Sequence, residues 1–240
     1  MSPTFIIMQR DFRAAFRSPL GAIVIAGVLL ADGIFFYWSA LSEKLLSAEV
    51  LERFFFNSSG VTACAAIVLS MRLLAEERQS GTIVLLNTSP VSCLQIVLGK
   101  YLAALTILGS TTLLSLYMPA LIFVNGKVSI GHILVGALGL TLLGAAILAI
   151  GLFASALAKS QVVAVVIGAL ITGCLYMMWI LGKSAEPPLK DFFGNLALHH
   201  ENFRPFMSGT LNLGCAMYYI AITYFFLFLA TKTLEARRWR

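Results

Sequence analysis

The sequence ILVGALGLTLLGAAILAIGLFASAL, residues 133–157, contains no charged residue and is long enough to cross a membrane as a helix. A bilayer core of roughly 30 Å needs about 20 helical residues. Five more apolar stretches of comparable length lie on either side of it. The six predicted spans cover residues 20–41, 54–74, 101–124, 133–157, 162–181 and 211–231. We therefore predict an all-α, polytopic membrane protein with six transmembrane helices, built as one transmembrane domain over residues 1–240.

The composition agrees with this class, because 59% of the residues are hydrophobic and 12% are charged, against about 25% charged in soluble proteins. With the N-terminus inside, eleven of the 17 Lys and Arg residues flank the inner ends of the spans and six the outer ends. This bias predicts that both termini are cytoplasmic. The net charge of +6 is then a topology signal, and no nucleic-acid partner is expected.

Residues 3–18 precede the first span and form an amphipathic pattern. On a helix, Arg10, Arg13 and Arg17 fall within about 60° of one another, and Phe5 and Phe12 lie on the opposite side. We expect an interfacial helix that contacts membrane lipid, with a simple topology-fixing flank as the alternative. The first span is about twice as long as a secretory signal core, so we expect it to be retained.

The segment between the second and third spans carries charges, a glycine and an apolar stripe. Glu76 and Glu77 are predicted to begin a short helix, where carboxylates favour the positive end of the dipole. Residues 83–86 supply the stripe, and Pro90 ends the helix. Such a stripe needs an apolar surface, either the inner ends of this chain's own helices or a groove on a partner.

Asp32 is the acidic residue placed near the centre of a predicted span. A charge at that depth is costly, which makes Asp32 a candidate for a membrane-embedded polar site. It could instead bond a neighbouring helix or be protonated. Small residues in the fourth span predict close helix packing. They are Gly136, Gly139, Gly144, Ala145, Ala149 and Gly151.

The last outer loop, residues 182–210, is too apolar for a flexible connection, so we expect short interfacial or re-entrant helices there. His199, His200 and Glu201 could ligate a metal, but adjacent histidines point in different directions, and we expect no metal site. The four cysteines lack the spacing of a metal site or a disulfide framework and are expected to be buried thiols.

No enzyme signature is found. Gly182-Lys183-Ser184 is similar to the end of a phosphate-binding P-loop, but Met177 stands where the motif needs a glycine. We therefore expect no catalytic residues and no cofactor bound by the chain itself.

The residues from Glu76 to Lys100 resemble the cytoplasmic loop of ABC-2 type transporter permeases, particularly the gliding-motility and nitrous-oxide-reductase-maturation branch. The resemblance rests on Glu-Glu-Arg-x-Ser-Gly-Thr at 76–82 and Leu-Leu-x-Thr-Ser-Pro-Val-Ser at 85–92, and extends to the closing residues 234–240. It covers essentially the whole chain. One departure is that the outer loops are short, whereas some members of the family carry large outer domains.

The resemblance implies a permease in the inner membrane of a bacterium that pairs with a second copy or a close relative around a central path. Two cytoplasmic ATPase subunits would bind ATP and Mg, and each would contact a coupling helix between the second and third spans, about residues 76–89. Their closure would push on that helix and drive export or mechanical work. The implied contact residues are Glu76, Glu77, Arg78, Gly81, Thr82 and Leu85.

Two alternatives stay open at this point. An ion-driven secondary transporter would use Asp32 as its cation site, although the inverted repeats and broken helices typical of that class are not seen. A non-transporting membrane anchor for an ATPase-driven machine would need the same coupling helix but no open path.

Overall fold

A computed structural model describes residues 3–41, 46–82, 91–122, 128–184, 186 and 189–238. All regular elements in these ranges are helices, and six of the helical stretches are long and apolar enough to cross a membrane. The elements are α1 (Pro3–Arg17), α2 (Pro19–Leu41), α3 (Ser47–Gln79), α5 (Cys93–Ser115), α6 (Tyr117–Leu121), α7 (Ile130–Leu157), α8 (Gln161–Ser184), α9 (Leu189–Leu196), α10 (Arg204–Met207) and α11 (Leu213–Arg238). The all-α, six-span prediction is confirmed.

Two helices extend beyond the predicted spans toward the segment between the second and third spans. Helix α3 continues past residue 74 to Gln79. Helix α5 begins at Cys93, eight residues before the predicted third span, and Ser92 and Gln95 form a capping box at its start. The third span continues through α6 to Leu121, with a change of helix at Leu116 just before Pro119. Polar residues therefore lie within helices that hydropathy alone would have ended.

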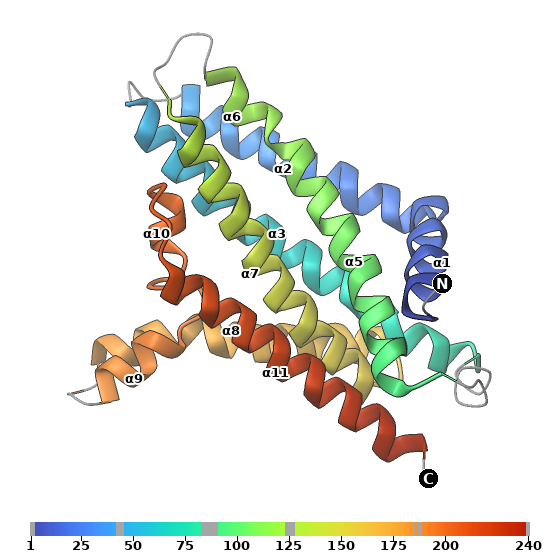
Figure 1. Ribbon diagram of the computed structural model, residues 1–240. Coiled ribbons are helices and arrows are strands. Elements are labelled where there is room, and N and C mark those ends of the chain that lie inside the picture. The colour runs from blue at the N-terminus through green and yellow to red at the C-terminus, as the bar shows by residue number, and fades with distance from the viewer. Residues whose placement is uncertain are drawn as a thin grey trace.

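Helix α7 is the centre of the bundle, and α3, α5, α8 and α11 all pack against it (Figure 1). Its glycines permit this packing. A Cβ at Gly144 would lie 2.3 Å from Leu108 of α5, and one at Gly136 would lie 2.3 Å from the ring of Phe55 of α3. The predicted close approach of helices at these small residues is confirmed.

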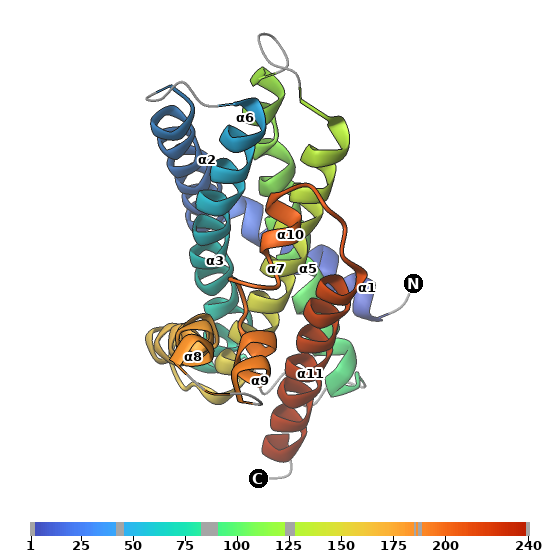
Figure 2. The ribbon, with the colours of Figure 1, turned by 90° about the vertical axis from the view of Figure 1, so that its left-hand side faces the viewer.

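Helices α2, α8 and α11 are the peripheral spans, and little of their surface is buried. Helix α8 crosses the others at a steep angle: it runs across the view behind α11 in Figure 1 and is seen nearly end-on in Figure 2. Cys64 and Cys174 are exposed on α3 and α8, so the prediction that all cysteines are buried is wrong for these two. The outward faces of membrane helices contact lipid or other subunits, which accept a thiol there.

Helix α1 forms as predicted and packs on α5. The side chain of Ile7 lies against Gly99, where a Cβ would come within 2.9 Å of it. Ser18 makes the turn into α2 by donating to the carbonyl of Ala15 and accepting from the amide of Gly21. The N-terminal helix and the C-terminus lie toward the same end of the bundle as the end of α3, and α6 lies toward the opposite end (Figure 1).

The connection between α8 and α11 contains the predicted short helices, and part of it is inserted into the bundle. Phe203 and Phe206 are fully buried, and Phe206 lies over Gly139 of α7. The amide of Leu198 donates to the carbonyl of Leu175, inside α8. His199 and His200 meet different partners, as expected for adjacent residues: the ring of His199 stacks on Tyr176 and that of His200 on Trp179.

Candidate functional site

The exposed end of α3 is a three-residue turn, Ser80-Gly81-Thr82. Gly81 has a φ of +75°, a conformation that costs little only for glycine and a few residues such as asparagine. The Ser80 hydroxyl donates to the carbonyl of Glu76, and the Thr82 hydroxyl donates to that of Glu77. The Glu76 carbonyl also accepts from the Ser80 amide, and the Thr82 hydroxyl supplies a donor to the Glu77 carbonyl in the last turn of the helix. The turn is thus locally fixed while its side chains face outward.

The prediction that Glu76 and Glu77 begin a helix is wrong, because they lie in the last turn of α3. Carboxylates at a helix C-terminus are disfavoured by the dipole, so each must gain from other contacts. Glu76 forms an ion pair with Arg72, one turn earlier, with Nε and Oε2 2.7 Å apart. Glu77 instead reaches α5 and α1. Hydropathy falls at residue 74, but a helix can continue into water past the membrane edge.

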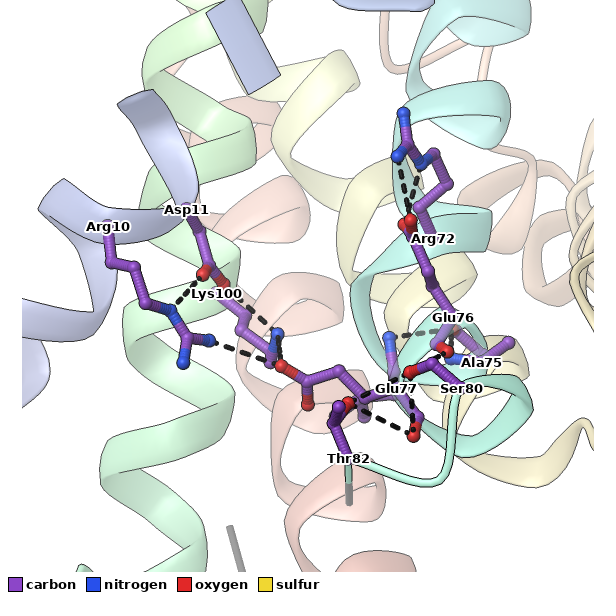
Figure 3. A network of polar contacts seen from close by, with 11 residues as sticks. Arg10, Asp11, Arg72, Ala75, Glu76, Glu77, Ser80, Thr82 and Lys100 are labelled. Atoms are coloured by element: carbon purple, nitrogen blue, oxygen red, sulfur yellow. Dashed lines mark hydrogen bonds and ion pairs between the residues drawn. The ribbon is translucent and has the colours of Figure 1, made fainter. Parts of the chain in front are cut away.

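A buried ion cluster links α1, α3 and α5 beneath this turn (Figure 3). The ammonium of Lys100 lies 2.8 Å from a Glu77 oxygen and 3.0 Å from an Asp11 oxygen, and the Lys100 side chain is 4% exposed. Arg10 joins both carboxylates, at 2.8 Å from Asp11 and 3.2 Å from Glu77. Two cations therefore balance two anions. The cluster fixes the interfacial helix and the end of α3 relative to each other.

Arg78 and Arg237 hold the last carbonyls of α7. A guanidinium nitrogen of Arg78 donates to the carbonyl of Ala158 at 2.9 Å, and one of Arg237 donates to that of Leu157 at 2.8 Å. Cations at a helix C-terminus are favoured by the dipole and satisfy its free acceptors. The end of α7 is thereby tied to both α3 and α11.

Ser155 of α7 inserts its hydroxyl into the backbone of α3 just before the charged turn. The oxygen accepts from the amides of Leu74 and Ala75, at 3.1 and 2.9 Å, and donates to the carbonyl of Met71. A side chain that enters a helix ladder in this way is a recognised cause of local bending. The last turn of α3 is thus positioned by a contact from the central helix.

The structure divides the six predicted coupling residues. Glu77 and Arg78 face the protein's own helices and are half-buried, whereas Glu76 is partly exposed, and Gly81 and Thr82 are exposed. Leu85 and the rest of the segment 83–90 lie outside the described residues. The exposed surface that the structure describes is therefore the turn itself.

Lys100, Asp11 and Arg10 were not identified as site residues from the sequence. From the sequence, Lys100 is a loop charge, because it precedes an apolar stretch. Its buried position depends on Asp11 and Glu77, which lie 89 and 23 residues away along the chain. One signal was present: Asp11 is the one acid among the arginines of the interfacial helix. An isolated opposite charge on a basic face indicates a specific ion partner.

Asp32 is buried inside the bundle, as a charge at membrane depth requires. The hydroxyl of Ser115 of α5 donates to Asp32 Oδ2 at 2.7 Å. Asp32 Oδ1 and the hydroxyl of Ser58 have no hydrogen-bond partner among the described residues. The observed contact is a tether between α2 and α5, which favours the helix-bonding role of Asp32.

Residues 7–208 match the family model described as "ABC-2 family transporter protein". The match spans most of the chain, and the chain therefore belongs to the ABC-2 transporter family. No curated protein matches it. Together with the six apolar helices, this identifies a multi-pass membrane permease of an ABC transporter.

Proposed function

We propose that this chain is the permease half of a bacterial ABC-2 exporter or ATP-driven machine, powered by two separate cytoplasmic ATPase subunits. It pairs with a second copy or a close relative, and it belongs to the gliding-motility and nitrous-oxide-reductase-maturation branch of the family. Both termini are cytoplasmic, and ATP and Mg bind to the partner. Family membership supports ATP-driven over ion-driven work.

One observation carries the proposal: the Ser80-Gly81-Thr82 turn is exposed on the protein surface, and the helix end that carries it is held by contacts from three other helices. A surface that transmits force must not yield when it is pushed. The Lys100 cluster, the contact of Arg78 with Ala158 and the hydroxyl of Ser155 each tie the end of α3 to another element. ATPase closure against this turn would thus move α3 together with α1, α5 and α7.

The proposed contact residues have different roles. Glu76, Gly81 and Thr82, with Leu85 further along, face the ATPase. Glu77 and Arg78 are positioning residues, because their charged groups bind inside the permease. A Cβ at Gly81 would meet no atom of the described residues within 4 Å, so these leave space for a partner to approach.

The chain contains its own control for a test of this contact. Ser208-Gly209-Thr210 repeats the Ser-Gly-Thr sequence toward the opposite end of the bundle, and Gly209 also has a φ of +75°. Both threonine hydroxyls donate to a carbonyl five residues earlier. Thr82→Trp and Thr210→Trp therefore place the same bulk on the same local geometry.

The experiment is co-purification of each variant with the ATPase encoded beside it, followed by ATP turnover of the assembled complex. We expect Thr82→Trp to abolish assembly or permease-stimulated turnover and Thr210→Trp to leave both intact. Gly81→Asn, which tolerates the positive φ, should weaken assembly without unfolding the turn. Unchanged assembly and turnover in Thr82→Trp would remove this turn from the interface.

A further inference from the structure

A second candidate site lies at the other end of α8, away from the ATPase-facing turn. A cavity of about 600 Å³ opens between α8, α9 and the segment that leads into α11. Three cations line it, Lys183 of α8, Lys190 of α9 and Arg204 of α10. None of the three forms an ion pair with another described residue. Glu201 is the one acid among the described residues that line the cavity.

Lys183 is held by packing that the structure describes. The Lys183 ammonium lies 4.3 Å from the centre of the Trp179 ring, and His200 stacks on the same tryptophan with ring centres 4.5 Å apart. A Cβ at Gly182 would lie 3.2 Å from the Gly194 amide, so α8 and α9 are in close contact. The charges thus come together from three separate elements on an aromatic base.

We propose that this cavity binds the phosphate headgroup of an anionic phospholipid. Convergent ammonium and guanidinium groups are suited to phosphate oxygens, and arginine and lysine both bind them by charge-assisted hydrogen bonds. The charge count places this end outside, where lysine and arginine are disfavoured beside short loops. Half of the six predicted outer cations nevertheless line this one cavity, which indicates a ligand.

The surface next to the cavity selects a lipid over a soluble phosphate. Met177, Ile180 and Leu181 are exposed on α8 directly before Lys183, and Leu170 is exposed further along the helix. Trp179 lies near the end of the span, at the level where tryptophan accumulates in membrane proteins. An acyl chain can contact these exposed apolar side chains of α8 while the headgroup occupies the cavity.

The test is native mass spectrometry of the purified full chain in detergent, titrated with phosphatidylglycerol, phosphatidylcholine and glycerol phosphate. We expect a saturable phosphatidylglycerol adduct, weak phosphatidylcholine binding and little glycerol phosphate binding. Loss of two charge-assisted contacts in Lys183→Gln/Arg204→Gln should weaken phosphatidylglycerol binding about tenfold or more. Lys159→Gln, which removes an exposed lysine next to the opposite end of α8, should not change it.

Equal affinity for phosphatidylcholine, or unchanged phosphatidylglycerol binding in the double variant, overturns the proposal. Glycerol phosphate binding as tight as that of the lipid overturns the lipid assignment and makes this a site for soluble phosphate. The Glu201→Gln variant adds an independent arm, because removing the acid should tighten phosphatidylglycerol binding. No ATPase is present in this experiment, so its outcome is separate from that of the coupling test.

Discussion

Lys100 has two carboxylate partners at less than 3.1 Å and almost no exposed surface. A lysine in such a position is stable only with its counter-ions, and the reverse also holds for Asp11 and Glu77. Each member of the cluster is therefore required by the others, although none would be expected to matter from its own sequence neighbourhood.

Lys100→Met should lower the free energy of unfolding by about 3–5 kcal/mol, because it leaves two carboxylates with one remaining cation in a largely buried site. Denaturant unfolding in detergent measures this loss. Lys159→Met, at an exposed lysine, should change stability by less than about 0.5 kcal/mol. The double variant Lys100→Met/Glu77→Gln should recover part of the loss. Equal stability of Lys100→Met and the native chain would contradict the buried cluster.

His199 gives the fold a pH dependence. Burial, with a smaller effect of His200, lowers the pKa of His199 to about 4, from about 6.5 in an unfolded chain. The neutral ring is therefore favoured in the fold. The contribution of neutral His199 to the free energy of unfolding is complete above pH 6.5. It is lost as the pH falls from 6.5 toward 4, by at most about 3 kcal/mol.

Unfolding measured between pH 7.5 and about pH 4 should show this loss in the native chain. In His199→Gln the dependence should be smaller by the same amount, because glutamine does not titrate. His200→Gln is the matched control, because His200 is exposed. In this variant the His199 ring is still present, so most of the pH dependence of stability should remain. Identical pH slopes for the native chain and His199→Gln would exclude His199 as the titrating group.

At the scale of elements, the six spans follow from hydropathy, whereas the extension of α3 and α5 beyond the predicted spans depends on ion pairs. Arg72 and Lys100 lower the hydropathy at the ends of α3 and α5, but ion pairs within the fold neutralise them. The end of α3 is set by the positive φ of Gly81 instead of by the membrane edge. A single sequence shows the glycine but not the partners that allow the helix to reach it.

The contact of Ser155 with α3 makes a prediction for the end of that helix. Ser155→Ala removes an oxygen that accepts from the amides of Leu74 and Ala75 and donates to the carbonyl of Met71, at a cost of about 1–3 kcal/mol. Amide hydrogen exchange at Ala75 should accelerate correspondingly, with Ser110→Ala as a control that loses a hydroxyl bonded only within its own helix. Unchanged exchange at Ala75 would contradict the insertion.

The packing of α10 on α7 depends on a glycine. A Cβ at Gly139 would lie 2.5 Å from Phe206, so Gly139→Ala should displace the buried aromatic segment and cost about 1–3 kcal/mol. On α8, the added Cβ of Gly173→Ala meets no atom within 4 Å in the part of the chain that the structure describes, so this variant should be neutral or slightly stabilising. Thermal unfolding of the two variants compares them. Equal midpoints would place Phe206 away from Gly139.

At the scale of the whole molecule, the sequence predicted the class, which the family match confirms, whereas the ATPase contact near residues 76–89 stays a prediction. The sequence could not separate residues that face a partner from residues that face the protein's own helices. Glu76, Glu77 and Arg78 are adjacent, and a turn of helix directs them to Arg72, Lys100 and Ala158 respectively. That division depends on where α5 and α7 lie, which no local pattern contains.

The orientation of the whole chain can be tested by labelling in intact cells. In a background without native cysteines, Thr82→Cys should react only after permeabilisation, and Thr210→Cys should react with an impermeant reagent added outside. The charge count gives the physical reason, since most cations flank the end that contains Thr82. Labelling of Thr82→Cys from outside would reverse the topology and exclude a cytoplasmic ATPase contact at this turn.

The hydrogen bonds from Arg78 and Arg237 to the last carbonyls of α7 have a consequence for the C-terminal tail. Removing Arg237 and the residues after it leaves the Leu157 carbonyl without its guanidinium donor. This loosens the adjacent Ala158, whose carbonyl accepts from Arg78. If the proposed ATPase contact is made at the turn after α3, such a truncation would make the contact surface less rigid, although it lies far from that turn along the chain. A fusion placed at the C-terminus would then alter the coupling that it was meant only to report.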